Sequence, residues 1–77
     1  MKGDDPNAVR IVLSTHPDRQ KALDLARRLV DERLAACVNV VDGATSIYRW
    51  EGKVCEEPEF LLIIKTAERC IGKLKHR

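Results

Sequence analysis

Three cysteines and two histidines carry the softest metal-binding atoms in this sequence. They are Cys37, Cys55, Cys70, His16 and His76. Thiolates and imidazoles suit copper and zinc, but a site needs two or more of them close together. The cysteines form no CxxC pair, so their spacing indicates neither a zinc module nor a disulfide scaffold. We keep Cys37, Cys55 and His16 as weak candidate ligands, and the sequence alone leaves the ligand set unknown.

Each of these candidates also has an ordinary structural interpretation. His16 lies where we expect a strand to give way to a helix, and an exposed histidine at a helix start is the commoner case. Cys37 follows two alanines and precedes a valine, which is typical of a thiol packed as a small apolar group. We expect Cys55 to be the more exposed thiol and therefore the better candidate for accidental metal binding or oxidation.

Motifs typical of enzymes are missing from the sequence. It contains no GxSxG, no HExxH and no glycine-rich phosphate loop. The closely spaced carboxylates Glu56, Glu57 and Glu59 are interpreted as a solvated face. We therefore expect neither catalysis nor an organic cofactor.

Length and composition predict one small domain. The chain has 77 residues, 44% of them hydrophobic and 34% charged, with a net charge of +2. Basic residues are spread over several segments, so charge gives no sign of nucleic-acid binding. No apolar run has the length of a membrane span, and the charges near the N-terminus do not fit a signal peptide. Three cysteines without a disulfide pattern fit a reducing compartment, so we expect a cytoplasmic protein without membrane or nucleic-acid partners.

Two helices are expected to position the candidate residues. The first should begin at Pro17, which suits the first helical position. Its apolar stripe consists of Ala22, Leu25, Ala26, Leu29 and Val30. Asp24 and Arg28 have the spacing of a stabilising pair on that helix. Thr66 is expected to cap a second, short helix.

Three strands are expected beside these helices. Ile11–Leu13 has the composition of a short buried strand, and Phe60–Ile64 that of a central strand covered on both faces. Pro58 should make this central strand irregular unless it lies at an edge. Glu51-Gly52 predicts a hairpin turn that pairs Tyr48 with Cys55.

The segment from Cys37 to Tyr48 allows two interpretations. Asp42-Gly43 in its middle is either a two-residue hairpin turn or a glycine bulge within one long strand. The order strand, helix, strand, strand, helix is that of an α+β, ferredoxin-like split βαβ sandwich without its last strand. We therefore expect a single domain over residues 1–77, with a flexible tail over residues 1–7 and an incomplete C-terminal side.

Three segments of the sequence resemble a known family. LVDERLAACVNVV, GATSIYRWEGK and LLIIKT follow one another in the order found in the CutA divalent-cation tolerance proteins, and the similarity extends from about Val9 to Thr66. The resemblance favours the bulge at Asp42-Gly43. It also implies a homotrimer in which long bent strands reach across to neighbouring subunits.

The function implied by this resemblance is the binding of divalent cations, copper above all, in connection with metal tolerance. The metal site proposed for some family members uses a cysteine at the end of the first strand, together with a histidine and a glutamate. The cysteine position falls on Ser14 here, and the other two lie beyond Arg77. This three-ligand site therefore cannot be transferred to the chain.

Two aromatic residues and a lysine form a second candidate site, given the implied trimer. Tyr48, Trp50 and Lys65 could line a cleft between subunits that holds a small anionic or planar ligand. Alternatively, the two rings fill a seam between subunits, and we prefer this interpretation. Lys65 either pairs with an acidic residue such as Glu51 or reaches water. The rival functional hypothesis is a trimeric signalling or scaffold protein that binds a small ligand or a partner in these intersubunit clefts.

Overall fold

The computed structural model describes residues 5–74 as a three-stranded antiparallel sheet with helices. The elements are β1 (Val9–His16), α1 (Arg19–Asp31), β2 (Cys37–Trp50), β3 (Lys53–Ala67), a 3₁₀ helix η1 (Glu68–Cys70) and α2 (Ile71–Leu74). The strand order is β1-β3-β2, so β3 lies between the two strands that α1 connects. The expected α+β, split βαβ fold is confirmed.

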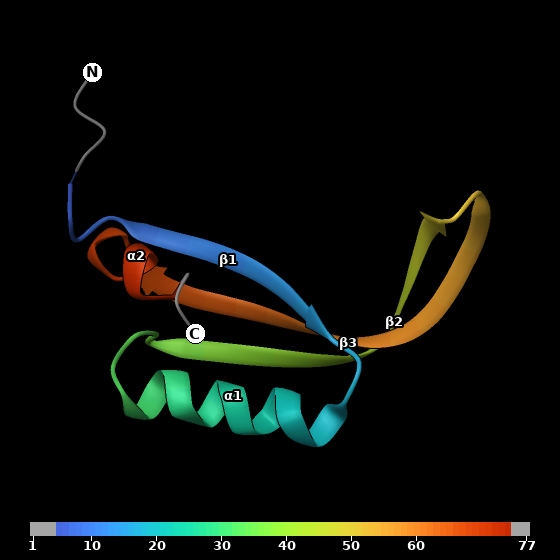
Figure 1. Cartoon of the computed structure of the whole chain (residues 1–77). Coiled ribbons are helices and arrows are strands. Elements are labelled where there is room, and N and C mark those ends of the chain that lie inside the picture. The colour runs from blue at the N-terminus through green and yellow to red at the C-terminus, as the bar shows by residue number, and fades with distance from the viewer. Residues whose placement is uncertain (1–4, 75–77) are drawn as a thin grey trace.

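Helix α1 covers one face of the sheet (Figure 1). Its buried residues Ala22, Ala26 and Leu29 pack with Leu62 and Ile64 of β3, and Leu34 and Ala35 complete the core. The predicted apolar stripe is thus correct in its centre, while Val30 at its edge is 44% exposed.

The start of α1 differs from the prediction by two residues. Asp18 is the N-cap, with an extended backbone, and its carboxylate accepts a hydrogen bond from the Lys21 backbone N–H at 3.0 Å. Pro17 therefore precedes the helix instead of opening it. Asp24 accepts hydrogen bonds from Gln20 and Arg27, so the predicted pairing of Asp24 with Arg28 is wrong.

The other face of the sheet has no cover among the described residues. We call it the open face; alternation along the paired strands assigns to it Val9, Ile11, Leu13, Thr15, Cys37, Asn39, Val41, Leu61, Ile63 and Lys65. Ile11 is 55% exposed and Leu13 64% exposed. The expectations that Ile11–Leu13 is buried and that Phe60–Ile64 is covered on both faces are not met within residues 5–74, because α1 lies on one face only.

Strand β2 continues through Asp42-Gly43, which confirms the bulge. Val41 pairs with Leu61 and Ala44 with Glu59, so two residues of β2 face one residue of β3. Gly43 has a φ of 85°, a value that glycine adopts at little cost. The Asp42 carboxylate also forms an ion pair with Arg19 at 3.4 Å, which links the bulge to the start of α1.

Beyond the bulge, β2 and β3 form a two-stranded ribbon that bends away from α1 (Figure 1). We call this ribbon, residues 44–59, the arm. Glu51 and Gly52 both have positive φ and close its tip, and Tyr48 pairs with Cys55 as predicted. Pro58 pairs with Thr45 in the arm, where β3 has a single neighbouring strand, so a residue without a backbone N–H is tolerated.

The second helical segment begins later than predicted. Thr66 is part of β3 and buried, and its hydroxyl donates to the Leu34 carbonyl at 2.5 Å. The prediction of Thr66 as a helix cap is wrong because its side chain joins β3 to the middle of the α1–β2 loop. Residues 5–8, partly assigned to a flexible tail, form a turn whose carbonyl groups accept from Glu68 and Arg69 backbone N–H groups.

Candidate functional site

The three candidate metal ligands lie in different parts of the molecule. Cys37 pairs with Lys65 at one end of the sheet, His16 pairs with Phe60 at the end of β1, and Cys55 lies in the arm. Within residues 5–74, no group of three or more His, Cys, Asp or Glu side chains could hold a metal ion. His76 lies outside these residues.

The exposure of the cysteines is the reverse of the expectation. Cys37 is exposed on the open face, whereas Cys55 and Cys70 are half-buried. Cys37 therefore does not act as a core residue in this chain. Its sulfur lies 4.0 Å from the Asn39 side-chain oxygen.

His16 has a local structural contact at the start of α1. Its Nδ1 accepts a weak hydrogen bond from the Asp18 backbone N–H at 3.4 Å. Ser14, the position at which the resemblance implies a cysteine ligand, is half-buried on the helix side of the sheet and pairs with Leu62. A hydroxyl there is a hard, neutral and poor ligand for copper.

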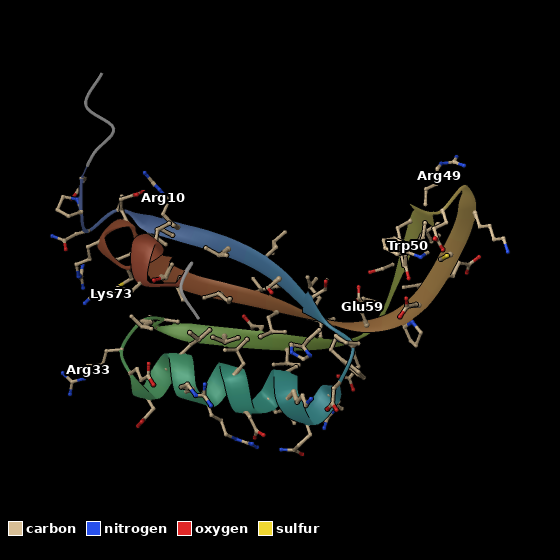
Figure 2. The ribbon with its side chains drawn as sticks, in the orientation of Figure 1. Arg10, Arg33, Arg49, Trp50, Glu59 and Lys73 are labelled. Carbon is tan, nitrogen blue, oxygen red and sulfur yellow. The ribbon has the colours of Figure 1, made fainter. Side chains whose placement is uncertain are left out.

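Tyr48, Trp50 and Lys65 do not come together within one chain. Tyr48 and Trp50 lie in the arm, and Trp50 is 63% exposed near its tip (Figure 2). Lys65 lies towards the far end of β3, in the three-stranded part of the sheet. Glu51 is at the arm's turn, so the suggested pairing of Glu51 with Lys65 does not form in the described chain. A cleft containing all three residues would need more than one copy, and it stays a prediction.

The arm carries a row of polar contacts that the sequence interpretation missed. Glu59, Glu57 and Cys55 continue the side of β3 that carries Lys65, and so face the inside of the bend. We call this side the inner face of the arm; it also carries Ser46, Tyr48 and Trp50. Figure 2 shows Glu59 projecting from the base of the arm towards the side to which the arm bends.

Both carboxylates of this row accept hydrogen bonds from hydroxyl groups. Ser46 donates to Glu59 Oε1 and Tyr48 donates to Glu57 Oε1. The hydrogen bond to Glu57, followed by desolvation and the charges nearby, raises the pKa of Tyr48 from 10.0 to about 12. The sequence contains one signal for this row. Glu57 and Glu59 are spaced two residues apart on one strand, and Ser46 and Tyr48 have the same spacing on the neighbouring strand.

A pocket of about 480 Å³ lies at the end of the sheet near η1. Its charged lining residues are Arg33, Lys65 and Arg69, and no carboxylate lines it. Its walls include Val9, Leu34 and Ala67, so the lining is mostly apolar with a few polar groups, as in many small-molecule sites. Arg69 is held by the Asn7 side-chain oxygen at 2.5 Å.

A wider groove of about 1030 Å³ follows α1 along the outer edge of β2. It is lined by apolar Val30, Val38 and Val40 and by charged residues that include Arg27, Arg28 and Asp31. None of the predicted site residues lines it.

Comparison with known sequences places this fold in a family. A sequence model described as "CutA1 divalent ion tolerance protein" matches residues 10–77. The divalent-cation tolerance protein CutA of Thermus thermophilus is 54% identical over 67 residues, which cover 87% of this chain and 65% of that protein. The chloroplastic protein CutA of Arabidopsis thaliana is 48% identical over 64 residues, which cover 83% of this chain and 35% of that protein.

Solved structures agree with the sequence comparison. The divalent cation tolerance protein Cut A1 of Thermus thermophilus superposes with a TM-score of 0.86 at 51% identity, over 91% of this chain and 68% of that one. A "PII-like protein CutA" from Nostoc superposes with a TM-score of 0.76 at 39% identity, over 86% and 62% of the two chains. The described helices and strands and these matches define one class, and the chain belongs to the CutA1 divalent ion tolerance family. It spans 65% of the Thermus protein's length and smaller fractions of several other relatives.

Proposed function

We propose that this protein contributes to the tolerance of divalent cations, with copper as the first ion to test, and that it acts as a homotrimer. The observation that carries the proposal is membership of the CutA1 family, whose members are named for this property. Catalysis is not part of the proposal, because the sequence contains no catalytic motif. No helix among residues 5–74 is long and apolar enough to cross a membrane.

The way in which the protein would hold a metal ion is constrained by the geometry. Residues 5–74 of one chain supply no three-ligand cluster, so Cys37, Cys55 and His16 do not fit a site within a single copy. Direct binding would therefore need ligands from more than one copy or from outside these residues. A role in tolerance that does not involve direct binding is equally compatible with this geometry.

A growth assay tests the tolerance role. Expression in a bacterial strain that lacks its own CutA protein should raise the copper concentration at which growth stops, relative to an empty vector. Unchanged growth at every copper, zinc and cobalt concentration, with the protein present at normal levels, would contradict the proposal.

Calorimetric titration separates direct binding from an indirect role. Copper titrated into the purified protein should release or absorb heat with a defined stoichiometry, because thiols are strong copper ligands. Replacing Cys37, Cys55 and Cys70 with serine should abolish this signal, while His16→Ala tests the remaining candidate. Absence of copper uptake by the wild-type protein would favour the second function described next.

The second candidate is a trimeric signalling or scaffold protein that binds a small ligand. The pocket beside Lys65 favours it, because three cationic side chains line it without a carboxylate. Titration with inorganic phosphate and with citrate, followed by NMR, should shift the signals of Arg33 and Arg69 if the pocket accepts anions. Matched titrations of Arg33→Gln should give weaker shifts, and those of Arg28→Gln should not differ from wild type.

We also propose that the protein works in the cytoplasm. The support is its three free cysteines, which suit a reducing compartment. The related CutA protein of Archaeoglobus fulgidus, which is 32% identical, is described as periplasmic. Fractionation of cells that express the protein should recover it with cytoplasmic markers.

A further inference from the structure

Opposite charges lie at the two ends of one continuous, uncovered side of the molecule. Lys65 lies near one end of the open face, and Glu57 and Glu59 lie on the inner face of the arm. Because β3 carries no bulge, alternation places all three on the same side of that strand. Exposed Ile11 lies beside Lys65, and exposed Leu13, which pairs with Ile63, lies on the sheet between the two charged regions.

The two carboxylates are oriented but not neutralised. Each accepts a hydroxyl hydrogen bond at its Oε1, from Tyr48 to Glu57 and from Ser46 to Glu59. These contacts hold the carboxylates in place, and no cationic group of residues 5–74 lies within ion-pair distance of either. The raised pKa of Tyr48 is consistent with the negative charge gathered there. A positively charged group is therefore the chemically matching partner for this face.

Lys65 of the same chain cannot be that partner. At about 3.3 Å per residue, β3 extends roughly 20 Å from Glu59 to Lys65, which is much longer than a lysine side chain. Lys65 itself has no ion pair with any described residue. Both ends of the surface therefore present charges that residues 5–74 of the same chain leave unpaired.

We propose that Lys65 of one copy pairs with Glu59 and Glu57 on the inner face of the arm of a second copy. The inference rests on the proposed homotrimer and specifies how its subunits meet. The open face of one copy then packs into the bend of the next arm, which covers Ile11, Leu13 and Ile63. The Lys65 end of one copy meets the glutamate end of the next, so the contact is head to tail. Such contacts repeat from copy to copy until the ring closes.

The chemistry of this contact favours a second copy over an unrelated protein. The surface contains both the lysine and the carboxylates, so it is complementary to itself once it is offset along β3. Charge pairs set register and exclude wrong orientations, while the apolar residues between them supply the area that is removed from water. If two copies met with their β3 strands aligned in the same direction and without this offset, Lys65 would face Lys65 and Glu59 would face Glu59. Like charges would then repel each other.

Charge reversal tests the pairing. Lys65→Glu and Glu59→Lys should each weaken self-association at least tenfold in sedimentation equilibrium, because each places like charges in contact. The double variant with both changes should recover most of the wild-type association, since the pair is restored with its charges exchanged. Added salt should weaken the wild-type association, because ions screen the charge pairs.

Matched variants control for net charge and folding. Glu56 lies on the outer face of the arm, opposite to the inner face, and Lys21 lies on the exposed side of α1. Glu56→Lys and Lys21→Glu should therefore each leave the association constant within about threefold of wild type. Lys65→Met retains the apolar stem without the charge and serves if Lys65→Glu does not fold. Circular dichroism verifies that each variant is folded before its mass is measured.

The outcomes distinguish this inference from the homotrimer itself. A wild-type protein that stays monomeric would overturn both. A wild-type trimer whose charge variants behave like the controls, or whose double variant is weaker than either single variant, would overturn the pairing alone. Recovery in the double variant, together with losses in both single variants, supports it.

Discussion

Tyr48 is the residue whose chemistry the structure alters most clearly. Its hydroxyl donates to the Glu57 carboxylate, and this contact raises its pKa to about 12. Tyr48 is also the single tyrosine of the chain, so its ionisation can be followed without interference from another phenol. The pKa of Tyr48 therefore reports directly on this hydrogen bond of the arm.

We predict that the tyrosinate absorbance of the folded protein rises with a midpoint near pH 12 and not at 10.0. Because the folded pKa lies above the unfolded value, Tyr48 stabilises the folded state below about pH 10 and loses this contribution as the pH rises through 12. Glu57→Gln should move the midpoint back towards 10.0, since the charged acceptor is gone. Glu56→Gln on the outer face is the control, and an unchanged midpoint in Glu57→Gln would show that the contact is absent in solution.

Thr66 has a structural role that its position in the sequence conceals. Its buried hydroxyl donates to the Leu34 carbonyl and so fixes the segment that leads from α1 into β2. We predict that Thr66→Val lowers the free energy of unfolding by about 1 to 2 kcal/mol, because the substitution leaves a carbonyl group without its partner. Urea denaturation at fixed protein concentration measures the loss. Thr45→Val, at an exposed position of the arm, should change little, and equal losses in both variants would contradict the assignment.

At the scale of the element, the bulge in β2 determines where the arm begins. It offsets the β2–β3 register by one residue, and Arg19 pairs with Asp42 at the same point. The positive φ of Gly43 allows the extra residue to fit, and no atom lies within 4 Å of where a Cβ would stand. The cost of a side chain there is therefore conformational and not steric.

We predict that Gly43→Ala lowers the free energy of unfolding by about 1 kcal/mol, the usual cost of a left-handed conformation for alanine. Gly72→Ala in α2 is the matched control, because Gly72 also has free space around it and its φ is not positive. Alanine is the better helix former, so this control should be neutral or slightly stabilising. Thermal unfolding by circular dichroism compares the two, and a stable Gly43→Ala would mean that the bulge can relax.

Local patterns predicted the elements of this fold better than they predicted its contacts. Period-2 and helical patterns, together with the Glu51-Gly52 turn, located the strands, α1 and the hairpin. A threonine before a helix resembles a cap, but the tertiary structure brings the Leu34 carbonyl to the Thr66 hydroxyl instead. Glu57 and Glu59 resemble a solvated face in the sequence, because their partners Tyr48 and Ser46 are on another strand.

The metal candidates show a second limit of sequence reasoning. A cysteine or histidine is recognisable by type, but the distances between such residues are set by the fold, and here they keep Cys37, Cys55 and His16 apart. The buried or exposed state of Cys37 depends on what covers the open face, and residues 5–74 of one chain do not cover it. The sequence therefore identifies candidate ligands by residue type, but it does not show whether they lie close enough to form a site.

At the scale of the whole molecule, the arm and the open face are the features that favour self-association. The radius of gyration is 14.5 Å, whereas a compact domain of this length would have roughly 11 Å. The difference reflects the arm, which extends from the core as a two-stranded ribbon, and such ribbons are marginal by themselves in water. Exposed Ile11, Leu13 and Trp50 add apolar surface that a small monomer would not normally leave to solvent.

Self-association would account for both features, and it makes thermal stability depend on concentration. We predict that the Tm of the wild-type protein rises over a roughly hundredfold increase in protein concentration, because association stabilises the folded state by mass action. Light scattering on the same samples should give the mass of three chains. The weakened variant Lys65→Glu should melt lower, since fewer of its folded chains are assembled at a given concentration. A wild-type Tm that stays constant across this range, with the mass of one chain throughout, would show that the arm and the open face are stable in water without a partner.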